Sequence, residues 1–256
     1  MKLWIVLVLS ISSYLMMAQG PPITTGTPVM LGLEGAGIRT FGKYIKKENA
    51  SAYVHVFGVP YNISPKFQVG GVIPFKWVTP RGQKRVGGLS DVAVFAKYQI
   101  FKRDGVAKTF RILATLKQTF PTGDSRSMPA LGTGIYQTAL GLVLGRVTSR
   151  VGLYADGAYQ LRSGGVTDDL VYNLSMGVPL LPHRYPQRQI NAYVEFNGHY
   201  ILNSEIHSLF LSPGLQYIGG RRILFEASVQ LPLLQRNVEQ NKSNYNVLLG
   251  TRFLFN

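Results

Sequence analysis

Few residues of this chain could carry catalysis or bind a metal ion. Its 256 residues include four histidines and no cysteine, which excludes disulfides, thiolate metal sites and cysteine nucleophiles. No histidine and carboxylate residues cluster at metal-ligand spacing. The glycine-rich segments 35–37 and 132–134 are not phosphate loops, because no lysine follows them and no helix is predicted there. We therefore expect no cofactor and no metal site.

The composition favours a β protein with an apolar exterior. Charged residues make up 15% of the chain, against a usual share of about 25%. The formal net charge is +15, but the basic residues are scattered over predicted loops rather than one face, so we expect no nucleic-acid partner. A soluble β-sandwich is the alternative, although it would not need aromatic residues at the strand ends of its apolar face.

The N-terminus has the features of a secretory signal peptide. Lys2 precedes a nearly continuous apolar run from residue 3 to residue 17, and Ala18-Gln19 offers a cleavage site. The run of about 15 residues is short for a membrane-spanning helix, which needs about 20. We expect residues 1–18 to be removed on export.

The last residues alternate in the manner of a transmembrane β-strand. Between Tyr245 and Phe255 one face carries apolar and aromatic residues, with aromatics at both ends, and the other face includes Asn246 and Arg252. Alternate residues of a strand point to opposite faces, so this strand fits lipid on one side and a polar lumen on the other. We expect Phe255 to contribute to assembly, with the barrel assembly machinery as a partner of this strand.

The same alternation recurs along the chain and predicts an all-β fold, a closed antiparallel up-and-down transmembrane β-barrel of about 12 strands. Connections after odd-numbered strands are mostly long and those after even-numbered strands mostly tight. A bulge is expected at Pro213, which lacks a donor. The predicted strands span residues 33–41, 51–60, 66–77, 89–101, 107–119, 134–146, 150–161, 169–179, 188–201, 207–217, 221–231 and 244–255.

The chain thus divides into a signal peptide (1–18), an N-terminal segment rich in Pro, Gly and Thr (19–32), and a barrel (33–256). The segment is too rich in proline for a strand. It either tethers the barrel in the periplasm or enters the lumen, and the residues alone do not separate these alternatives.

Counting alternate residues gives a predicted lumen lining. Six basic and four acidic side chains give this lining a charge of about +2, so we expect weak ion selectivity and either a water-filled path or a plug of salt bridges. The aromatic members either form an apolar track or fill space. The lining comprises Lys76, Asp91, Lys97, Arg111, Lys117, Asp156, Glu195, His199, Arg222, Glu226 and Arg252, with the aromatic residues Tyr53, Phe57, Phe95, Tyr154, Tyr193 and Phe210.

Most of the positive charge falls on predicted rims and loops, such as Lys43, Lys46 and Lys47. The favoured role of these residues is contact with lipopolysaccharide phosphates. The alternative is steering of anionic solutes toward the mouth.

The histidines do not favour an enzyme. Some twelve-stranded outer-membrane barrels are phospholipases with Ser and His on the lipid-facing wall. Here His55 and His199 are predicted to face the lumen, His183 lies in a predicted periplasmic turn, and His207 begins a strand. We therefore expect no lipid hydrolysis.

Several short motifs resemble those of the outer-membrane "meta-pathway of phenol degradation" family of transporter barrels. They are Gly87-Gly88-Leu89-Ser90-Asp91-Val92 with Ala96-Lys97-Tyr98, Phe120-Pro121-Thr122-Gly123-Asp124, Leu211-Ser212-Pro213-Gly214-Leu215-Gln216-Tyr217, and Glu226-Ala227-Ser228 with Gln230-Leu231-Pro232. The resemblance covers about residues 66–255 and implies passive uptake of small aromatic or apolar solutes. It brings no functional residues with it.

We accordingly expect an integral protein of the bacterial outer membrane, in contact with its lipids, that passes small solutes. The alternative is a closed structural barrel that anchors a partner protein.

Overall fold

The computed structural model describes residues 20–182, 188–220, 222–238 and 242–255. The predicted signal peptide and His183 lie outside the described residues. The strands are β1 (Ala36–Lys47), β2 (Ala50–Ser64), β3 (Phe67–Pro80), β4 (Val86–Leu89), β5 (Ala93–Gly105), β6 (Lys108–Thr119), β7 (Gln137–Thr148), β8 (Gly152–Arg162), β9 (Asp169–Pro179), β10 (Gln189–Ile201), β11 (Ile206–Ile218), β12 (Ile223–Arg236) and β13 (Ser243–Phe255).

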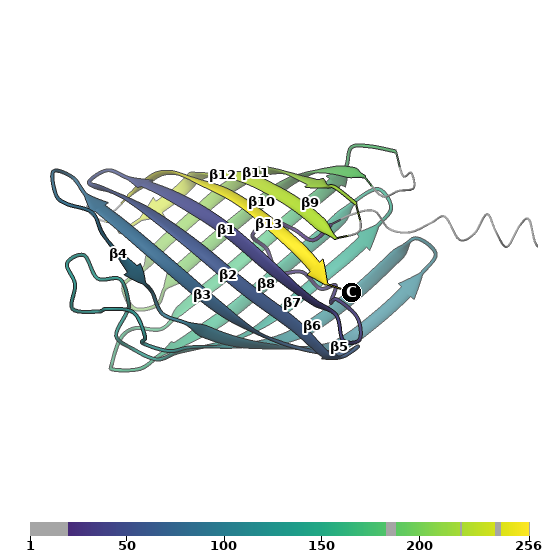
Figure 1. Ribbon diagram of the computed structural model, residues 1–256, viewed down its shortest axis with the longest axis horizontal. Helices are drawn as coiled ribbons and strands as arrows, with labels where there is room; N and C mark the ends of the chain where they lie inside the picture. The colour runs from purple at the N-terminus through teal and green to yellow at the C-terminus, as the bar shows by residue number, and fades with distance from the viewer. Residues whose placement is uncertain (1–19, 183–187, 221, 239–241, 256) are drawn as a thin grey trace, which may run out of the picture.

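The strands form one closed antiparallel barrel (Figure 1). Each long strand pairs with its neighbours in sequence, and β1 pairs with β13 along its whole length, from Ala36 opposite Phe255 to Lys47 opposite Ser243. Closure gives each long strand a partner on both sides, whereas the short β4 pairs with β3 alone. The predicted fold class, a closed barrel of 12 long strands, is confirmed, with the short β4 as an extra strand.

β3 is shared between two partners. Its first half pairs with β5, from Phe67 to Val72, and its second half pairs with β4, from Phe75 to Val78. The single strand predicted at 89–101 is thus split, because the chain leaves the sheet at residues 90–92 and then re-enters it. The break brings the side chain of Asp91 to a loop contact described below.

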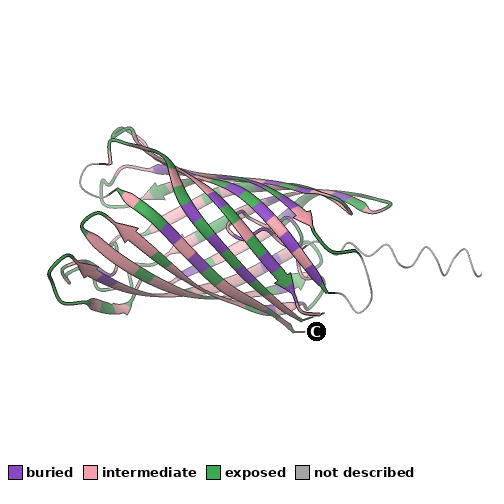
Figure 2. Cartoon of the chain, turned by 90° about the horizontal axis from the view of Figure 1, so that it is seen from above, coloured by how far each residue is buried: buried purple, intermediate pink, exposed green. Residues whose placement is uncertain are grey.

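Burial alternates along the strands (Figure 2). In β10, Tyr193 and Glu195 are each 1% exposed, whereas Val194 and Phe196 are 40% and 39% exposed. Polar and charged side chains therefore face inward while large apolar side chains face outward, the reverse of a soluble protein and the arrangement of a lipid-facing barrel.

The first strand is longer than its sequence suggested. The loop predicted at 42–50 is a turn at residues 48–49, because β1 runs on to Lys47. Within this extension Lys43 pairs with Val54 and Leu248 on the inward face, and Tyr44 pairs with Tyr53 on the outward face. Because three of the five residues from 43 to 47 are lysines, hydropathy alone does not show which face of this extension points inward.

Pro213 causes no bulge. It lies opposite Val194 in β10, and the β11–β12 pairing has the same register on either side of it, Leu211 with Leu231 and Gly214 with Ser228. The register shift falls instead between Leu209 and Phe210. The β11–β12 ladder thus has no pairs at residues 212 and 213 and continues in the same register, without an inserted residue.

No helix in the described part of the chain is long and apolar enough to cross a membrane.

The seam between β1 and β13 generates a first prediction. Phe255 points outward, is 43% exposed and packs on Phe253 with ring centroids 5.2 Å apart. We expect Phe255→Ala to lower the amount of folded protein in the outer membrane, because it removes an apolar anchor from the closing strand pair. Heat-modifiable gel migration measures the folded fraction. Deleting Asn256 is the control, and normal assembly of Phe255→Ala would contradict the prediction.

Candidate functional site: a plugged lumen

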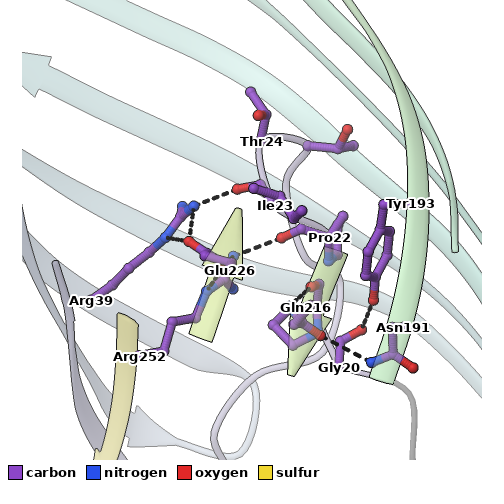
Figure 3. Close-up of polar contacts among 12 residues, drawn as sticks. Gly20, Pro22, Ile23, Thr24, Arg39, Asn191, Tyr193, Gln216, Glu226 and Arg252 are labelled. Carbon is purple, nitrogen blue, oxygen red and sulfur yellow. Dashed lines mark hydrogen bonds and ion pairs between the residues drawn. The ribbon is translucent and has the colours of Figure 1, made fainter. Parts of the chain in front are cut away.

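The N-terminal segment lies inside the barrel. Residues 20–31, called the plug below, pack against inward-facing side chains of β1, β7, β8, β10, β11 and β13. Figure 3 shows the contacts with Arg39, Tyr193, Gln216 and Arg252. Ile23 is fully buried and forms an apolar cluster with Val147, Tyr154, Tyr193 and Leu248. Prolines prevent the plug from pairing as a strand, so its backbone groups must find partners on side chains of the wall.

Glu195 binds the middle of the plug. Its carboxylate accepts hydrogen bonds from the backbone N–H groups of Ile23 at 2.8 Å, Thr24 at 2.8 Å and Thr25 at 3.2 Å. Ser175 adds a hydroxyl donor at 3.2 Å. Successive N–H groups form a concave anion site, and together these donors compensate a carboxylate that is only 1% exposed.

Two arginines bind the carbonyl groups of the plug. Arg39 donates to the carbonyl of Ile23, and Arg252 donates to that of Pro22 at 2.6 Å. The arginines lie directly opposite each other in the β1–β13 pairing, an arrangement that is destabilising for like charges. Glu226 lies between them and pairs with both, at 2.6 Å to Arg39 and 2.9 Å to Arg252.

Neutral groups and Asp156 add further hydrogen bonds to the plug. The Tyr193 hydroxyl donates to the Gly20 carbonyl at 2.6 Å, and the Gln216 amide donates to the Pro21 carbonyl at 2.7 Å. The N–H of Gly26 donates to Asp156 at 2.5 Å. Residues 20–26 are therefore bound to the wall through both their donors and their acceptors.

Gly145 shows how closely the plug fits the wall. A Cβ atom added there would lie 2.4 Å from a ring carbon of Pro28, so only glycine allows this approach of the plug to β7.

A loop at the opposite end of the barrel is also attached to the wall. Loop 120–136 is attached to the wall by Asp91, whose carboxylate accepts from the N–H of Gly123 at 2.9 Å and from both the N–H and the hydroxyl of Thr133 at 2.7 Å. Lys76 donates to the Ala130 carbonyl at 2.9 Å. A Cβ atom on Gly132 would lie 2.6 Å from the Asp91 carboxylate. These contacts give a physical role to the Ser-Asp and Thr-Gly-Asp motifs.

A cavity of about 820 Å³ remains beside the plug. Its lining runs from Arg222 and Leu224, near the chain termini, to Gln160 at the opposite end of β8. It is bounded by plug residues, by β1, β2, β3, β5 and β6, and also by residues of β7–β9 and β11–β13 such as Val147, Tyr154 and Leu254. The open part of the lumen is thus a lateral space along much of the barrel.

The strand pairings and side-chain contacts place most of the predicted lining residues on the inward face. Lys97, Lys117, Arg252, Phe95 and Tyr154 line the cavity. Asp156, Glu195, Glu226 and Tyr193 bind the plug or its arginines. The others lie toward the ends of the barrel: Lys76 and Asp91 at loop 120–136, His199 beside Asp169, Phe210 opposite Asn197, and Arg111 beside Asp104.

Two predicted lining residues, both aromatic, lie on the outer wall, and a third is not on a strand. Tyr53 and Phe57 point outward and are 36% and 39% exposed, whereas Val56 and Gly58 of the same strand line the cavity. Both faces of β2 are apolar, so no charge identified the inner one, and the small residues rather than the aromatics face inward. Arg222 lies in the turn before β12, still at the cavity lining but not on a strand.

His55 is also on the outer wall rather than in the lumen. One ring nitrogen lies 2.8 Å from the Thr40 hydroxyl, and the other lies 3.0 Å from the Tyr53 hydroxyl. The prediction that His55 faces the lumen is therefore wrong, and its hydroxyl partners are threonine and tyrosine rather than serine. Across the described residues, no three His, Asp or Glu side chains group as metal ligands.

Arg39, like Gln216 and Ser175, belongs to the contacts that hold the plug but was not among the predicted lining residues. The first strand alternates weakly, and the predicted inner charges omitted this residue. Its place opposite Arg252 follows from the observed register of Ala36 with Phe255, which the predicted strand start at residue 33 does not give.

Solved structures with a similar fold are outer-membrane barrels. The COG4313 outer membrane channel from Pseudomonas putida F1 matches with a TM-score of 0.70 at 10% identity, covering 91% of this chain and 100% of that one. The likeness shows the fold and no more. The β domain of the Bordetella autotransporter BrkA matches with a TM-score of 0.51 at 14% identity, covering 86% and 99%. The KdgM porin in complex with oligogalacturonate matches with a TM-score of 0.50 at 10% identity, covering 85% and 99%.

No protein-family model matches the sequence, and no curated protein sequence matches it.

The arginine pair generates a second prediction. Glu226→Gln leaves two guanidinium groups facing each other across a strand pair without an anion, and losing one partner of a buried ion pair costs about 3–5 kcal/mol. We expect a lower urea midpoint of unfolding in detergent micelles. Glu205→Gln is the matched control, because the Glu205–Arg236 pair is about two-thirds exposed. Equal midpoints for both variants would contradict the role of Glu226.

Proposed function

We propose that the protein is an outer-membrane channel for passive uptake of small solutes, and that solutes pass through the cavity beside the plug. The observation that carries the proposal is the lateral cavity, whose lining reaches from the end near the termini to the far end of β8. The likeness to an outer membrane channel supports it.

The solute class follows from the motif resemblance and from the dimensions of the cavity. About 820 Å³ is within the usual range of small-molecule pockets, and Phe95, Val56 and Val72 give it apolar walls. We propose that small aromatic or apolar compounds enter here after export, removal of residues 1–18 and barrel assembly. Contact of the basic rim with lipopolysaccharide belongs to the same proposal.

Conductance in planar bilayers tests the proposal. The purified protein is expected to give small conductance steps, and liposomes that contain it should take up small apolar or aromatic solutes. A barrel that gives neither conductance nor uptake would support the alternative, a closed anchor for a partner protein. Recovery from the soluble periplasm would contradict the outer-membrane location.

The plug generates a third prediction. Glu195→Ala leaves three backbone N–H groups of the plug without their acceptor, and a hydrogen bond to a charged group is worth about 1.5–3 kcal/mol. We expect the plug to detach more often and single-channel conductance to become larger and noisier. Deleting residues 20–31 should give the largest conductance. Glu205→Ala is the control, and identical traces for all variants would contradict a path beside the plug.

A further inference from the structure

Charges of opposite sign are segregated within the lumen. The carboxylates of Asp156 and Glu195 face the plug, and that of Glu226 faces the two arginines. Among the described residues no Asp or Glu lines the cavity, whereas five basic residues do: Arg39, Lys97, Lys117, Arg222 and Arg252. The nearly balanced lumen expected from the sequence therefore presents a positive surface to any solute, because the plug occupies the negative side chains.

Two of these cations lie together on neighbouring strands. In the β5–β6 pairing Phe95 is opposite Lys117, and Lys97 is opposite Thr115. The lysines are therefore diagonal neighbours on one face, where long side chains can reach a common point. Neither ammonium group forms an ion pair with a carboxylate of the described residues.

The surroundings of the two lysines are apolar. The Lys97 ammonium lies 5.7 Å from the centroid of the Phe95 ring, and Val56 and Val72 belong to the same cavity lining. An ammonium group held against apolar walls is stabilised when an anion binds beside it and compensates its charge. A carboxylate has two oxygens and can accept a hydrogen bond from each ammonium group.

We propose that the cavity binds a small organic carboxylate, with the carboxylate between Lys97 and Lys117 and its apolar part against Phe95. The inference rests on the proposed function, since the ligand must reach the lumen, and it narrows the solute class from apolar compounds to amphipathic anions. An inorganic anion would use the lysines but leave the apolar wall without a partner, and a neutral aromatic compound would do the reverse.

Benzoate is a suitable probe, and benzyl alcohol is its neutral counterpart of similar size. Binding is measured by equilibrium dialysis of the full-length protein in detergent, and channel block is measured on single channels at low and high KCl. We expect benzoate, but not benzyl alcohol, to bind and to interrupt the current. The block should weaken at high salt, because salt screens the charges.

Two double substitutions and a control test whether the lysine pair itself, rather than the net charge of the protein, binds benzoate. Lys97→Met with Lys117→Met is expected to weaken benzoate binding at least tenfold, the consequence of losing about 1.4 kcal/mol. Lys97→Arg with Lys117→Arg keeps both charges and should retain binding. Lys66→Met, an exposed turn residue outside the cavity lining, is the control and should bind as the wild type does. Heat-modifiable migration verifies that each variant is folded.

The outcomes distinguish this inference from the channel proposal. Conductance with equal effects of benzoate and benzyl alcohol, or benzoate binding that survives the double methionine variant, would overturn the carboxylate site and leave the channel intact. Lysine-dependent benzoate binding without conductance would support the site and overturn passive transport. Equal competition by chloride and benzoate at the same concentration would overturn the contribution of the apolar wall.

Discussion

The buried carboxylate of Glu195, with its three backbone donors, is the interaction on which the lumen depends. A proline-rich segment has no strand or helix to satisfy its peptide groups, and inside a barrel it has little water either. An ionised carboxylate aimed at successive N–H groups meets this need and has its own charge compensated in return. The plug binds β8 and β10 and also β1, β11 and β13, and the remaining space extends from it to β2, β3, β5 and β6. The shape and the sign of the cavity both follow from this placement.

The Arg39–Glu226–Arg252 cluster connects the plug to barrel closure. Its members come from β1, β12 and β13, and its arginines bind plug carbonyls. A pair of opposed arginines is tolerable only with an anion between them, and Glu226 has two oxygens to share. The same cluster therefore holds the last strand pair together and orients the segment that narrows the lumen. The cluster carries one net positive charge, which contributes to the positive lining of the cavity.

Much of the barrel could be predicted from the sequence, because alternation is a direct consequence of strand geometry. Alternation identified the inward face correctly where a strand has charge on one face and apolar residues on the other, as at Glu195 beside Val194 and Phe196. It failed in β2, where Tyr53 and Val54 are both apolar and only size separates the faces. The plug contacts could not be predicted, since they use backbone N–H and C=O groups that every residue type carries. The motif at Asp91 was visible, but its contact with Gly123 and Thr133 depends on a loop whose course no local pattern determines.

The plug precedes all the strands of the barrel, and most of the residues that bind it come from the last strands of the chain. Residues 20–31 precede every strand, whereas Glu195, Gln216, Glu226 and Arg252 lie on β10–β13. The plug can therefore make its full set of contacts only after β10–β13 have been synthesised. The narrowing of the lumen by the plug thus depends on the last four strands of the barrel.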